Sequence, residues 1–311
     1  MKIPLHGIIP PLVTPLLDNN KIDEQGLVNL LEHIISGGVH GVFLLGTTGE
    51  APNLSYELRK KFIIKACSII NKRIPVVVGI TDTSVSGSLE IAKVANEAGA
   101  DGLVISAPYY IPISQKEMVE YLEFLVPKLP LPFMMYNMPS CTKLHMSVET
   151  VRRAKELGAI GIKDSSGDLE YLFSLIEAFK DSPDFSIIVG TELFIPETIK
   201  KGGHGAVAGG ANMFPKLFVD LYEASKNNDT ERIKTLREKL VQINDKIYNV
   251  SDEGSRYIKS IKYTLSEMGI CSEFVAMPFS QFRNNKQKQM EKNISEITFW
   301  ETQNIKNHTK T

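Results

Sequence analysis

The chain has 311 residues, of which 43% are hydrophobic and 23% charged, and its formal net charge at pH 7 is −1. This balance excludes the strongly basic surface that binding to nucleic acid or to an anionic membrane requires, so we expect neither partner. No apolar run approaches the roughly 18 residues needed to span a bilayer, and the N-terminus lacks the apolar stretch of a signal peptide.

The cysteines indicate a reducing compartment. Cys67, Cys141 and Cys271 stand far apart, and no Cys-x-x-Cys spacing is present. An odd, scattered set of cysteines argues against a disulfide framework. We therefore expect a cytoplasmic protein.

Eight apolar runs of strand length alternate with helical patterns along most of the chain. Most runs are apolar at every position, as in 76–78, which is typical of strands covered on both faces. The segments between them carry apolar residues at helical spacing, for example Leu27, Leu30 and Ile34. The predicted strands are 7–13, 42–45, 75–79, 103–107, 133–136, 159–163, 186–190 and 205–208.

This alternation predicts an α/β fold, a TIM (β/α)8 barrel, with an open doubly wound sheet as the alternative. A recurring Gly-x-x-Gly before every second predicted strand supports the closed barrel. Each first glycine stands where a helix should end, and each second glycine stands where a strand begins. The pairs are Gly38–Gly41, Gly99–Gly102, Gly158–Gly161 and Gly202–Gly205.

Helical patterns continue after the eighth strand. Apolar residues recur every three or four positions from Ile233 to Ile247, and a second amphipathic stretch covers about 252–268. The polar C-terminal end contains a small apolar cluster, Ile294–Trp300, so we expect either a loosely ordered tail or a docked short helix. The predicted parts are a barrel with the active site (1–224), C-terminal helices packed on it (225–282) and a polar tail (283–311).

The sixth predicted strand ends in a lysine, Lys163, and a turn-forming segment follows. One interpretation is a surface lysine whose stem lies along apolar side chains while its ammonium group reaches water. The other is a Schiff-base nucleophile, because burial disfavours the charged form of an amine and a neutral amine can attack a carbonyl carbon. The resulting iminium is an electron sink for breaking a neighbouring C–C bond.

Other polar residues follow the predicted strands, at the end of a barrel where active sites lie. Tyr136 ends the fifth strand, and it is either a core tyrosine with its hydroxyl toward solvent or a proton shuttle beside Lys163. The Gly46–Glu50 loop lacks the Gly-Lys-Ser/Thr ending of a phosphate loop. Its two hydroxyls and backbone N–H groups suit either ordinary turn capping or a carboxylate.

Three other chemistries find no support in the sequence. The Gly203-x-Gly205-x-x-Ala208 segment matches a dinucleotide fingerprint, but it precedes its strand instead of following one. The six histidines show no metal-ligand spacing, which suggests surface or structural roles. No Gly-x-Ser-x-Gly motif marks an acyl-transfer serine. We therefore expect neither a metal nor a cofactor.

These strand ends resemble, in order and spacing, the signature segments of the dihydrodipicolinate synthase / N-acetylneuraminate lyase family of class I aldolases. The resemblance covers roughly residues 6–282 and includes the Gly7–Pro15 and Gly202–Gly205 segments. It implies a (β/α)8 barrel with C-terminal helices, chemistry through a Schiff base with pyruvate, and a homotetramer built as a dimer of dimers. The signature segments are Gly46-Thr47-Thr48-Gly49-Glu50, Tyr136-Asn137-Met138-Pro139 and Gly161-Ile162-Lys163-Asp164.

The resemblance also implies a role for each matching catalytic residue. Lys163 would form the imine, and Tyr136 would shuttle protons. Thr47 would link Tyr136 to Tyr110, which would reach in from a neighbouring subunit. Among the substrate-binding residues, Thr48 and its backbone would hold the pyruvyl carboxylate, and Gly190 and Val207 would line the pocket through backbone groups.

Two departures from the family bear on the substrate. Dihydrodipicolinate synthases carry an arginine for the aldehyde substrate's carboxylate at the position of Cys141, and a thiol cannot supply a cationic fork. Sialic acid lyases carry an acidic pair and a serine where this chain has Glu192, Leu193 and Gly209, so only the first acid has a counterpart. Hydrogen bonds to a polyol remain available from Ser165, Ser166, Thr191 and Glu192.

We therefore predict an aldolase or dehydratase that acts on a 2-keto-3-deoxy sugar acid. Its small-molecule partners would be pyruvate and an aldehyde or a sugar acid. Dihydrodipicolinate synthase, which condenses pyruvate with aspartate semialdehyde, and N-acetylneuraminate lyase are the alternatives within the family. A barrel that binds a keto acid as a sensor without turning it over is the non-enzyme alternative.

Overall fold

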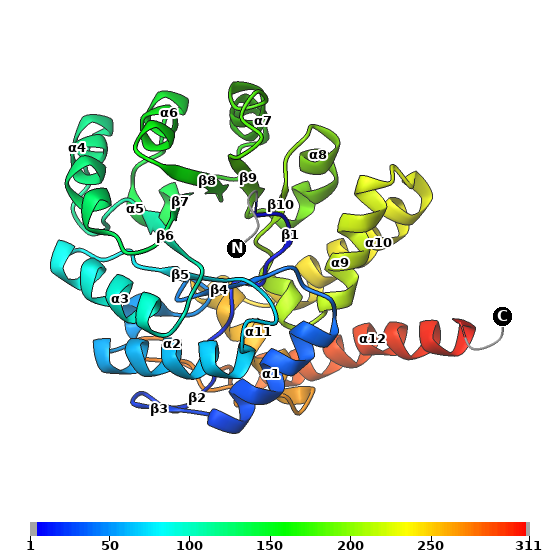
Figure 1. The fold of residues 1–311 in the computed structure, drawn as a ribbon. Coiled ribbons are helices and arrows are strands. Elements are labelled where there is room, and N and C mark those ends of the chain that lie inside the picture. The colour runs from blue at the N-terminus through cyan, green and yellow to red at the C-terminus, as the bar shows by residue number, and fades with distance from the viewer. Residues whose placement is uncertain (1–4, 309–311) are drawn as a thin grey trace.

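A ring of eight parallel strands lies at the centre of the fold, with helices around it (Figure 1). The computed structural model describes residues 5–308, and residues 298–308 by the course of their helix alone. The strand order is β1-β10-β9-β8-β7-β6-β5-β4. The strands are β1 Gly7–Ile8, β4 Val42–Leu44, β5 Val76–Gly79, β6 Gly102–Ser106, β7 Phe133–Asn137, β8 Ala159–Asp164, β9 Ser186–Val189 and β10 Gly205–Ala206.

The segment after β1 closes this ring into a barrel. On one side, β1 pairs with β10. On the other side, Pro11 forms a parallel bridge with Phe43 of β4, the Leu12 N–H donates to the Phe43 carbonyl at 2.9 Å, and the Phe43 N–H donates to the Pro10 carbonyl at 2.9 Å. The regular part of the first strand is short because prolines have no N–H for a ladder. The closed barrel is thus confirmed, and the open sheet is excluded.

Helices and short turns of helix connect the strands on the outside of the barrel. Serine or aspartate side chains cap several of their N-termini, and Ser114 and Glu117 form a reciprocal capping box. An antiparallel hairpin of β2 (Leu16–Asp18) and β3 (Lys21–Ile22) precedes the first helix. The helices are α1 Glu24–Ser36, α2 Tyr56–Ile70, α3 Val85–Glu97, α4 Gln115–Leu125, α5 Pro139–Thr142, α6 Val148–Glu156, α7 Leu169–Ala178, α8 Ile195–Lys200 and α9 Pro215–Lys226, with 3-10 turns η1 Ala51–Asn53, η2 Val126–Lys128, η3 Glu192–Phe194 and η4 Gly209–Asn212.

Two apolar cores follow from the alternation of side chains along the strands. In β6, Leu103 and Ile105 belong to the large core between strands and helices, whereas Val104 belongs to a small core inside the barrel. Tyr136 and Val207 are members of the inner core. Both side chains therefore face the inside of the barrel.

The glycine repeat has a physical cause at both of its positions. All four first glycines adopt φ angles between +83° and +102°, which suits the residue that ends a helix. A second glycine allows strands to approach closely, since a Cβ on Gly205 would lie 2.1 Å from the Gly7 carbonyl oxygen. The first glycines are Gly38, Gly99, Gly158 and Gly202.

The C-terminal part is helical, as predicted. The predicted seam of α10 is buried at Leu236, Leu240 and Ile243. The tail forms a helix that is longer than predicted and projects from the barrel (Figure 1). Its residues Met290, Ile294 and Ile297 are buried, whereas the side chains of Phe299 and Trp300 lie outside the described residues. The division of the chain at 224 and 282 stays a prediction. These elements are α10 Thr230–Ile243, the π-helical turn η5 Asn244–Tyr248, α11 Arg256–Glu267 and α12 Asn285–His308.

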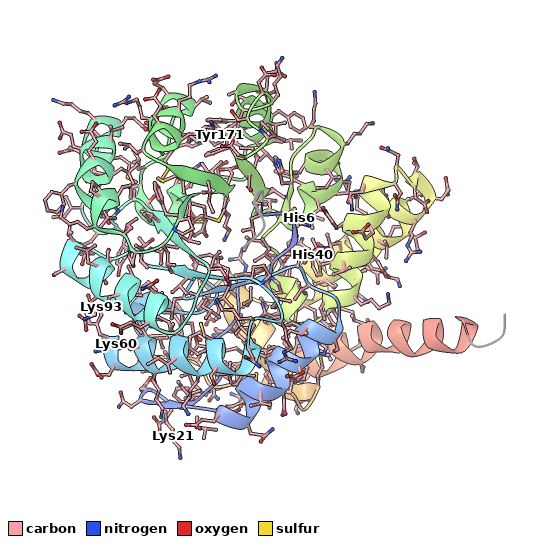
Figure 2. The ribbon with its side chains drawn as sticks, viewed as in Figure 1. His6, Lys21, His40, Lys60, Lys93 and Tyr171 are labelled. Carbon is pink, nitrogen blue, oxygen red and sulfur yellow. The ribbon has the colours of Figure 1, made fainter. Side chains whose placement is uncertain are left out.

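Histidines gather near the ends of the barrel strands that lie opposite the predicted active site. Figure 2 shows His6 beside His40, and their ring centroids are 5.8 Å apart. The Ile8 N–H donates to His40 Nδ1, and the Ile187 N–H donates to His204 Nδ1, each at 3.1 Å. Burial lowers the pKa of His40 and of His204, which favours the neutral rings that can accept these bonds. These two histidines are structural, as predicted.

Three further properties concern the described residues as a whole. No described helix is both long and apolar enough to cross a membrane. The three cysteines are free thiols. Among the described side chains, no group of three or more His, Cys, Asp or Glu residues is placed to hold a metal ion.

The close approach at Gly205 can be tested by a single methyl group. Gly205→Ala should lower the free energy of unfolding by at least about 2 kcal/mol, because overpacking a tight interior typically costs about 1–3 kcal/mol and here the clash is with backbone. Chemical denaturation measures the change. Gly254→Ala is the matched control, since its Cβ would meet nothing within 4 Å and should leave stability unchanged. Equal stability of the Gly205→Ala variant and the wild type would contradict this explanation.

Candidate active site

The lysine and the tyrosine singled out in the sequence lie side by side at the C-terminal ends of two neighbouring strands. β7 pairs with β8, and Tyr136 stands directly opposite Lys163 in the register. The Gly46–Glu50 loop follows β4, and its Thr47 hydroxyl lies 3.5 Å from the Tyr136 hydroxyl. Residues far apart in the chain thus meet at one rim of the barrel.

Lys163 is buried, with only 5% of its surface exposed. Its Nζ lies 3.9 Å from the centroid of the Tyr136 ring and 5.2 Å from that of Phe43. Among the side chains that the structure describes, two other lysines are buried, but each is paired with a glutamate: Lys259 with Glu253 and Lys262 with Glu50. The interpretation of Lys163 as a surface lysine is therefore wrong, because aromatic rings shield its amine from water.

Tyr136 is held in a single orientation by its neighbours. It is 6% exposed, and its ring packs edge-on against Phe43 with centroids 6.1 Å apart. The ring covers the lysine amine while the hydroxyl extends toward Thr47. A hydroxyl next to an amine and linked to a second hydroxyl can move protons to and from groups bound to that amine.

The Gly46–Glu50 loop is a tight turn fixed by hydrogen bonds. The Gly49 N–H donates to the Gly46 carbonyl and the Glu50 N–H donates to the Thr47 carbonyl, both at 3.0 Å. The buried Thr14 hydroxyl donates to the Gly49 carbonyl at 2.7 Å. Thr47 is exposed, whereas its neighbour Thr48 is buried. The loop therefore presents one hydroxyl toward Tyr136 from a backbone that is held in place.

A buried polar network lies next to the lysine, and the sequence analysis did not predict it. Asn137 Nδ2 donates to Asp164 Oδ1 at 2.8 Å, and the Met146 N–H donates to Asn137 Oδ1 at 3.1 Å. The Asp164 carboxyl also accepts bonds from the Ser166 hydroxyl and N–H. Burial raises the pKa of Asp164. The available signal was that polar residues directly follow Tyr136 and Lys163, which is unusual for buried strands.

The predicted substrate-binding residues of β7 to β10 lie at the same strand ends. Ser165 and Gly190 are adjacent, since a Cβ on Gly190 would lie 1.9 Å from the Ser165 hydroxyl oxygen. Val207 is buried in the inner core, and its N–H donates to the Val189 carbonyl at 2.8 Å. Cys141 is an exposed thiol on α5, the short helix after β7.

Glu192 is buried beneath the C-terminal helices. Its carboxyl accepts hydrogen bonds from the Gly210 N–H at 2.7 Å, from the Tyr257 hydroxyl at 3.0 Å and from the Tyr248 hydroxyl at 3.1 Å. Burial raises its pKa. The sequence analysis missed both tyrosines, which lie on elements outside the barrel. A contact between Glu192 and substrate stays a prediction.

Tyr110 lies apart from the other predicted catalytic residues in the single chain. It is 90% exposed, its φ angle is +83°, and its neighbour Ile111 is 70% exposed. A non-glycine residue in this conformation is uncommon. The loop after β6 thus carries two large apolar side chains into solvent.

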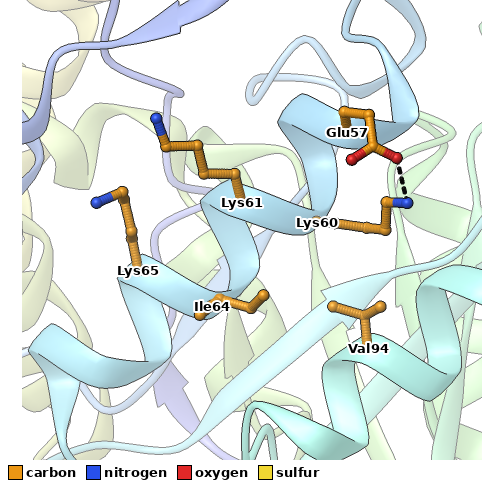
Figure 3. Close-up of a pocket in the computed structure, with 6 residues that line it drawn as sticks. All are labelled: Glu57, Lys60, Lys61, Ile64, Lys65 and Val94. Carbon is orange, nitrogen blue, oxygen red and sulfur yellow. Dashed lines mark ion pairs between the residues drawn. The ribbon is translucent and has the colours of Figure 1, made fainter.

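A surface groove elsewhere on the molecule is not a candidate site. Figure 3 shows it between α2 and α3, lined by Ile64, Val94 and a row of lysines. Lys60 is paired with Glu57, and Lys65 is paired with Glu24 at 2.9 Å, so their charges are neutralised on an exposed surface. No residue from the barrel rim lines this groove.

Comparison with known proteins places the chain among relatives of matching length. The model of the Dihydrodipicolinate synthetase family matches residues 4–297. A 4-hydroxy-tetrahydrodipicolinate synthase from Bartonella bacilliformis is 32% identical over 277 residues, which covers 88% of this chain and 92% of the relative. The Escherichia coli protein YagE, whose name proposes a 2-dehydro-3-deoxy-D-gluconate aldolase, is 32% identical over 240 residues and covers 76% of this chain and 80% of its own.

Solved structures agree with this placement. A dihydrodipicolinate synthase from Bacteroides thetaiotaomicron has a TM-score of 0.92 and 48% identity, covering 95% of this chain and 100% of the other. The structure of Escherichia coli YagE in complex with pyruvate has a TM-score of 0.89 and 28% identity, covering 95% of this chain and 99% of the other.

The polar network beside Lys163 makes a prediction about stability. Asn137→Ala should lower the free energy of unfolding by about 2–3 kcal/mol, because it removes buried partners from the Asp164 carboxyl and the Met146 N–H. Chemical denaturation measures this change. Asn29→Ala serves as the control, since Asn29 also makes two hydrogen bonds, donating to the Ile270 carbonyl and accepting from the Gln25 side chain, but both are exposed to solvent. Equal losses in the two variants would show that the network has no special importance.

Proposed function

We propose that this chain, which belongs to the dihydrodipicolinate synthetase family and is a class I, Schiff-base lyase, acts on a 2-keto-3-deoxy sugar acid. It would cleave this compound to pyruvate and an aldehyde, or form it from them. The observation that carries the proposal is the buried Lys163 amine packed against Tyr136 at the C-terminal rim of the barrel. A keto-acid sensor has no need of a shielded amine with a proton shuttle, so that alternative loses its support.

In the proposed reaction, the amine of Lys163 attacks the C2 carbonyl of the substrate, and loss of water gives an iminium. Breaking the C3–C4 bond sends its electron pair into the iminium and leaves an enamine. The C4 hydroxyl loses its proton and departs as the carbonyl of an aldehyde. Protonation of the enamine at C3 and hydrolysis release pyruvate and the free lysine. If the iminium instead loses a C3 proton to give the enamine, and the C4 hydroxyl then takes up a proton and departs as water, the enzyme would be a dehydratase.

The remaining residues of the rim would bind the keto acid and move the protons. Tyr136 would transfer protons between the substrate and the Thr47 hydroxyl, which lies 3.5 Å from its own. Thr48 and its backbone would hold the carboxylate, and the backbone of Gly190 and Val207 would line the site. The YagE structure, solved with pyruvate, supports pyruvate as the keto acid.

The proposed choice of a sugar acid rests on the charge of the rim near α5. Cys141 occupies the position where a synthase would carry its carboxylate-binding arginine, and it is an exposed, uncharged side chain. A neutral polyol needs hydrogen bonds and no cation. Ser165 and Thr191 are partly exposed at the neighbouring strand ends, and Glu192 lies beyond them. We propose that Ser165 and Thr191 contact the polyol directly, and that Glu192 does so by exchanging one of its protein hydrogen bonds for one to the substrate.

Dihydrodipicolinate synthase activity is the second candidate. The observation in its favour is the 48% identity to the synthase from Bacteroides thetaiotaomicron, which exceeds the identity to YagE. Its aldehyde substrate, aspartate semialdehyde, carries a carboxylate, so a cation other than residue 141 would have to bind it. N-acetylneuraminate lyase activity is less well supported, because Leu193 and Gly209 replace two of its polar groups.

We also propose that neighbouring subunits complete the site. Tyr110 is 90% exposed in the single chain, and a tyrosine so placed can enter the site of an adjacent copy and contact Thr47 there. Such a contact between two copies would be one part of the homotetramer, a dimer of dimers, that we propose. The free thiols support the proposed cytoplasmic location.

Trapping with borohydride tests the proposed nucleophile directly. Reduction in the presence of pyruvate should attach the keto acid's three-carbon unit to Lys163, because borohydride reduces the iminium to a stable amine. Peptide mass analysis locates the adduct. Lys259 and Lys262 are internal controls, since both are buried but paired with glutamates and should stay unmodified. Tyr136→Phe should slow the labelling about 10²–10⁴-fold, the usual contribution of a general acid–base group. An unlabelled Lys163 would contradict the proposed Schiff-base chemistry.

A substrate panel distinguishes the two candidate activities. Pyruvate release should be fastest with a 2-keto-3-deoxy sugar acid and slower with sialic acid, and condensation of pyruvate with aspartate semialdehyde should be weak. Cys141→Arg should improve that condensation about tenfold or more, since a bidentate pair with a carboxylate adds a charge-assisted interaction. Ser140→Arg is the control, since it adds the same charge next to Cys141 on α5 and should not improve the condensation equally. Efficient condensation by the wild type would favour the synthase.

A further inference from the structure

A buried ion pair joins the loop after β4 to the C-terminal helix α11. Glu50 ends the loop that carries Thr47 and Thr48, and its Oε1 lies 2.5 Å from Nζ of Lys262. Both side chains are fully buried, with 0% exposure. Neither residue was assigned a role by the sequence analysis, and neither belongs to the proposed catalytic set.

Each side chain of the pair has a second hydrogen-bonding partner, which fixes the orientation of that side chain. The Ala276 N–H donates to Glu50 Oε2 at 2.7 Å, and Lys262 Nζ donates to the Phe274 carbonyl at 2.6 Å. The chain segment after α11 is therefore held together with the loop by the same pair. Moving two charges out of water is costly, so such a pair contributes little net stability compared with apolar side chains of similar size.

The backbone at the two ends of the loop adopts a conformation that needs support. Leu45 has a φ angle of +57° and Glu50 one of +60°, and neither is a glycine. Non-glycine residues persist in this region only where their surroundings hold them, and such residues cluster at functional sites. Glu50 connects this conformation to α11. Its side chain is paired with Lys262, and its N–H donates to the Thr47 carbonyl at 3.0 Å.

We propose that Glu50 and Lys262 are positioning residues that hold Thr47 and Thr48 in the orientation that binds the keto-acid carboxylate and contacts Tyr136. The inference rests on the proposed function of this loop. Lys262 of α11 would thus affect the reaction through its contact with Glu50, without touching the substrate. A purely structural pair would affect stability alone, whereas a positioning pair affects the binding of pyruvate.

The test uses the full chain and measures the pyruvate concentration that gives half-maximal borohydride labelling of Lys163, together with the thermal midpoint of unfolding. Lys262→Met keeps an unbranched side chain that is one atom shorter and removes its charge. We expect it to raise the half-maximal pyruvate concentration at least about tenfold, since small misplacements of positioning groups have effects of this size or larger. An unchanged half-maximal concentration would overturn the proposal, whatever the thermal midpoint.

Two further variants keep the test decisive if Lys262→Met folds poorly. Glu50→Gln retains an oxygen that can accept from the Ala276 N–H but loses the charge, so it is a milder change and should also raise the half-maximal concentration. The double variant E50Q/K262M removes the unpaired charge, so it should regain thermal stability relative to Lys262→Met while its pyruvate requirement stays high. Recovery of both properties in the double variant would count against a positioning role.

Lys259→Met is the matched control. Lys259 is a second buried lysine of α11, but its partner is Glu253, which precedes the helix and lies outside the loop. This variant should lower the thermal midpoint and leave the pyruvate requirement unchanged. An equal rise in both lysine variants would mean that any loosening of α11 weakens binding, which refutes the specific role of the pair. Absence of labelling in the wild type would refute the proposed function itself, and the positioning role with it.

Discussion

The candidate site depends on the packing that keeps the Lys163 amine away from water at the rim of the closed barrel. Lys163 is held there because β8 pairs with β7 in a register that places Tyr136 opposite it, while Phe43 from β4 contributes a second ring, whose centroid lies 5.2 Å from the amine. A closed ring is needed for this arrangement, since Phe43 and Lys163 come from strands that are not neighbours in the sheet. The bridge between Pro11 and Phe43 closes that ring. The same packing that forms the inner core therefore also builds the reactive environment.

Two buried carboxyl groups connect the rim to the helices that follow the barrel. Glu50 meets Lys262 of α11, and Glu192 meets Tyr257 of α11 and Tyr248 of the π-helical turn before it. A buried carboxyl is costly unless its oxygens are satisfied, so each of these contacts has a defined geometry. The C-terminal helices are consequently tied to loops on different sides of the rim. The proposed influence of α11 on keto-acid binding rests on the first of these contacts.

The residues next to the amine are proposed to serve the chemistry common to the family, whereas other residues are proposed to select the substrate. Lys163, Tyr136 and Thr47, the proposed catalytic residues, lie together at the rim, and none of them would distinguish a sugar acid from an amino-acid precursor. In our proposal, that distinction depends on residues further from the amine, such as Cys141, whose thiol is exposed, and Glu192, whose carboxyl is buried. Tyr110 extends into solvent in the single chain, and its proposed role requires a contact with a second copy.

The sequence by itself predicted the eight strands, a barrel with an open sheet as the alternative, and a lysine and a tyrosine at two strand ends, because period-two and period-3.6 patterns and strand-end residues are local features that survive without tertiary information. The bridge between Pro11 and Phe43, which closes the ring, joins distant segments and was decided only by the tertiary structure. The sequence also determined that four glycines end helices, since a positive φ is a local requirement. Only the tertiary structure decided that Lys163 is buried, because a lysine at a strand end is compatible with either environment until its neighbours are known. The partners of Glu50, Glu192 and Asn137 were equally out of reach. Those contacts join segments distant in the chain, and a side chain's hydrogen-bonding partner is set by how the elements pack, not by the residues next to it.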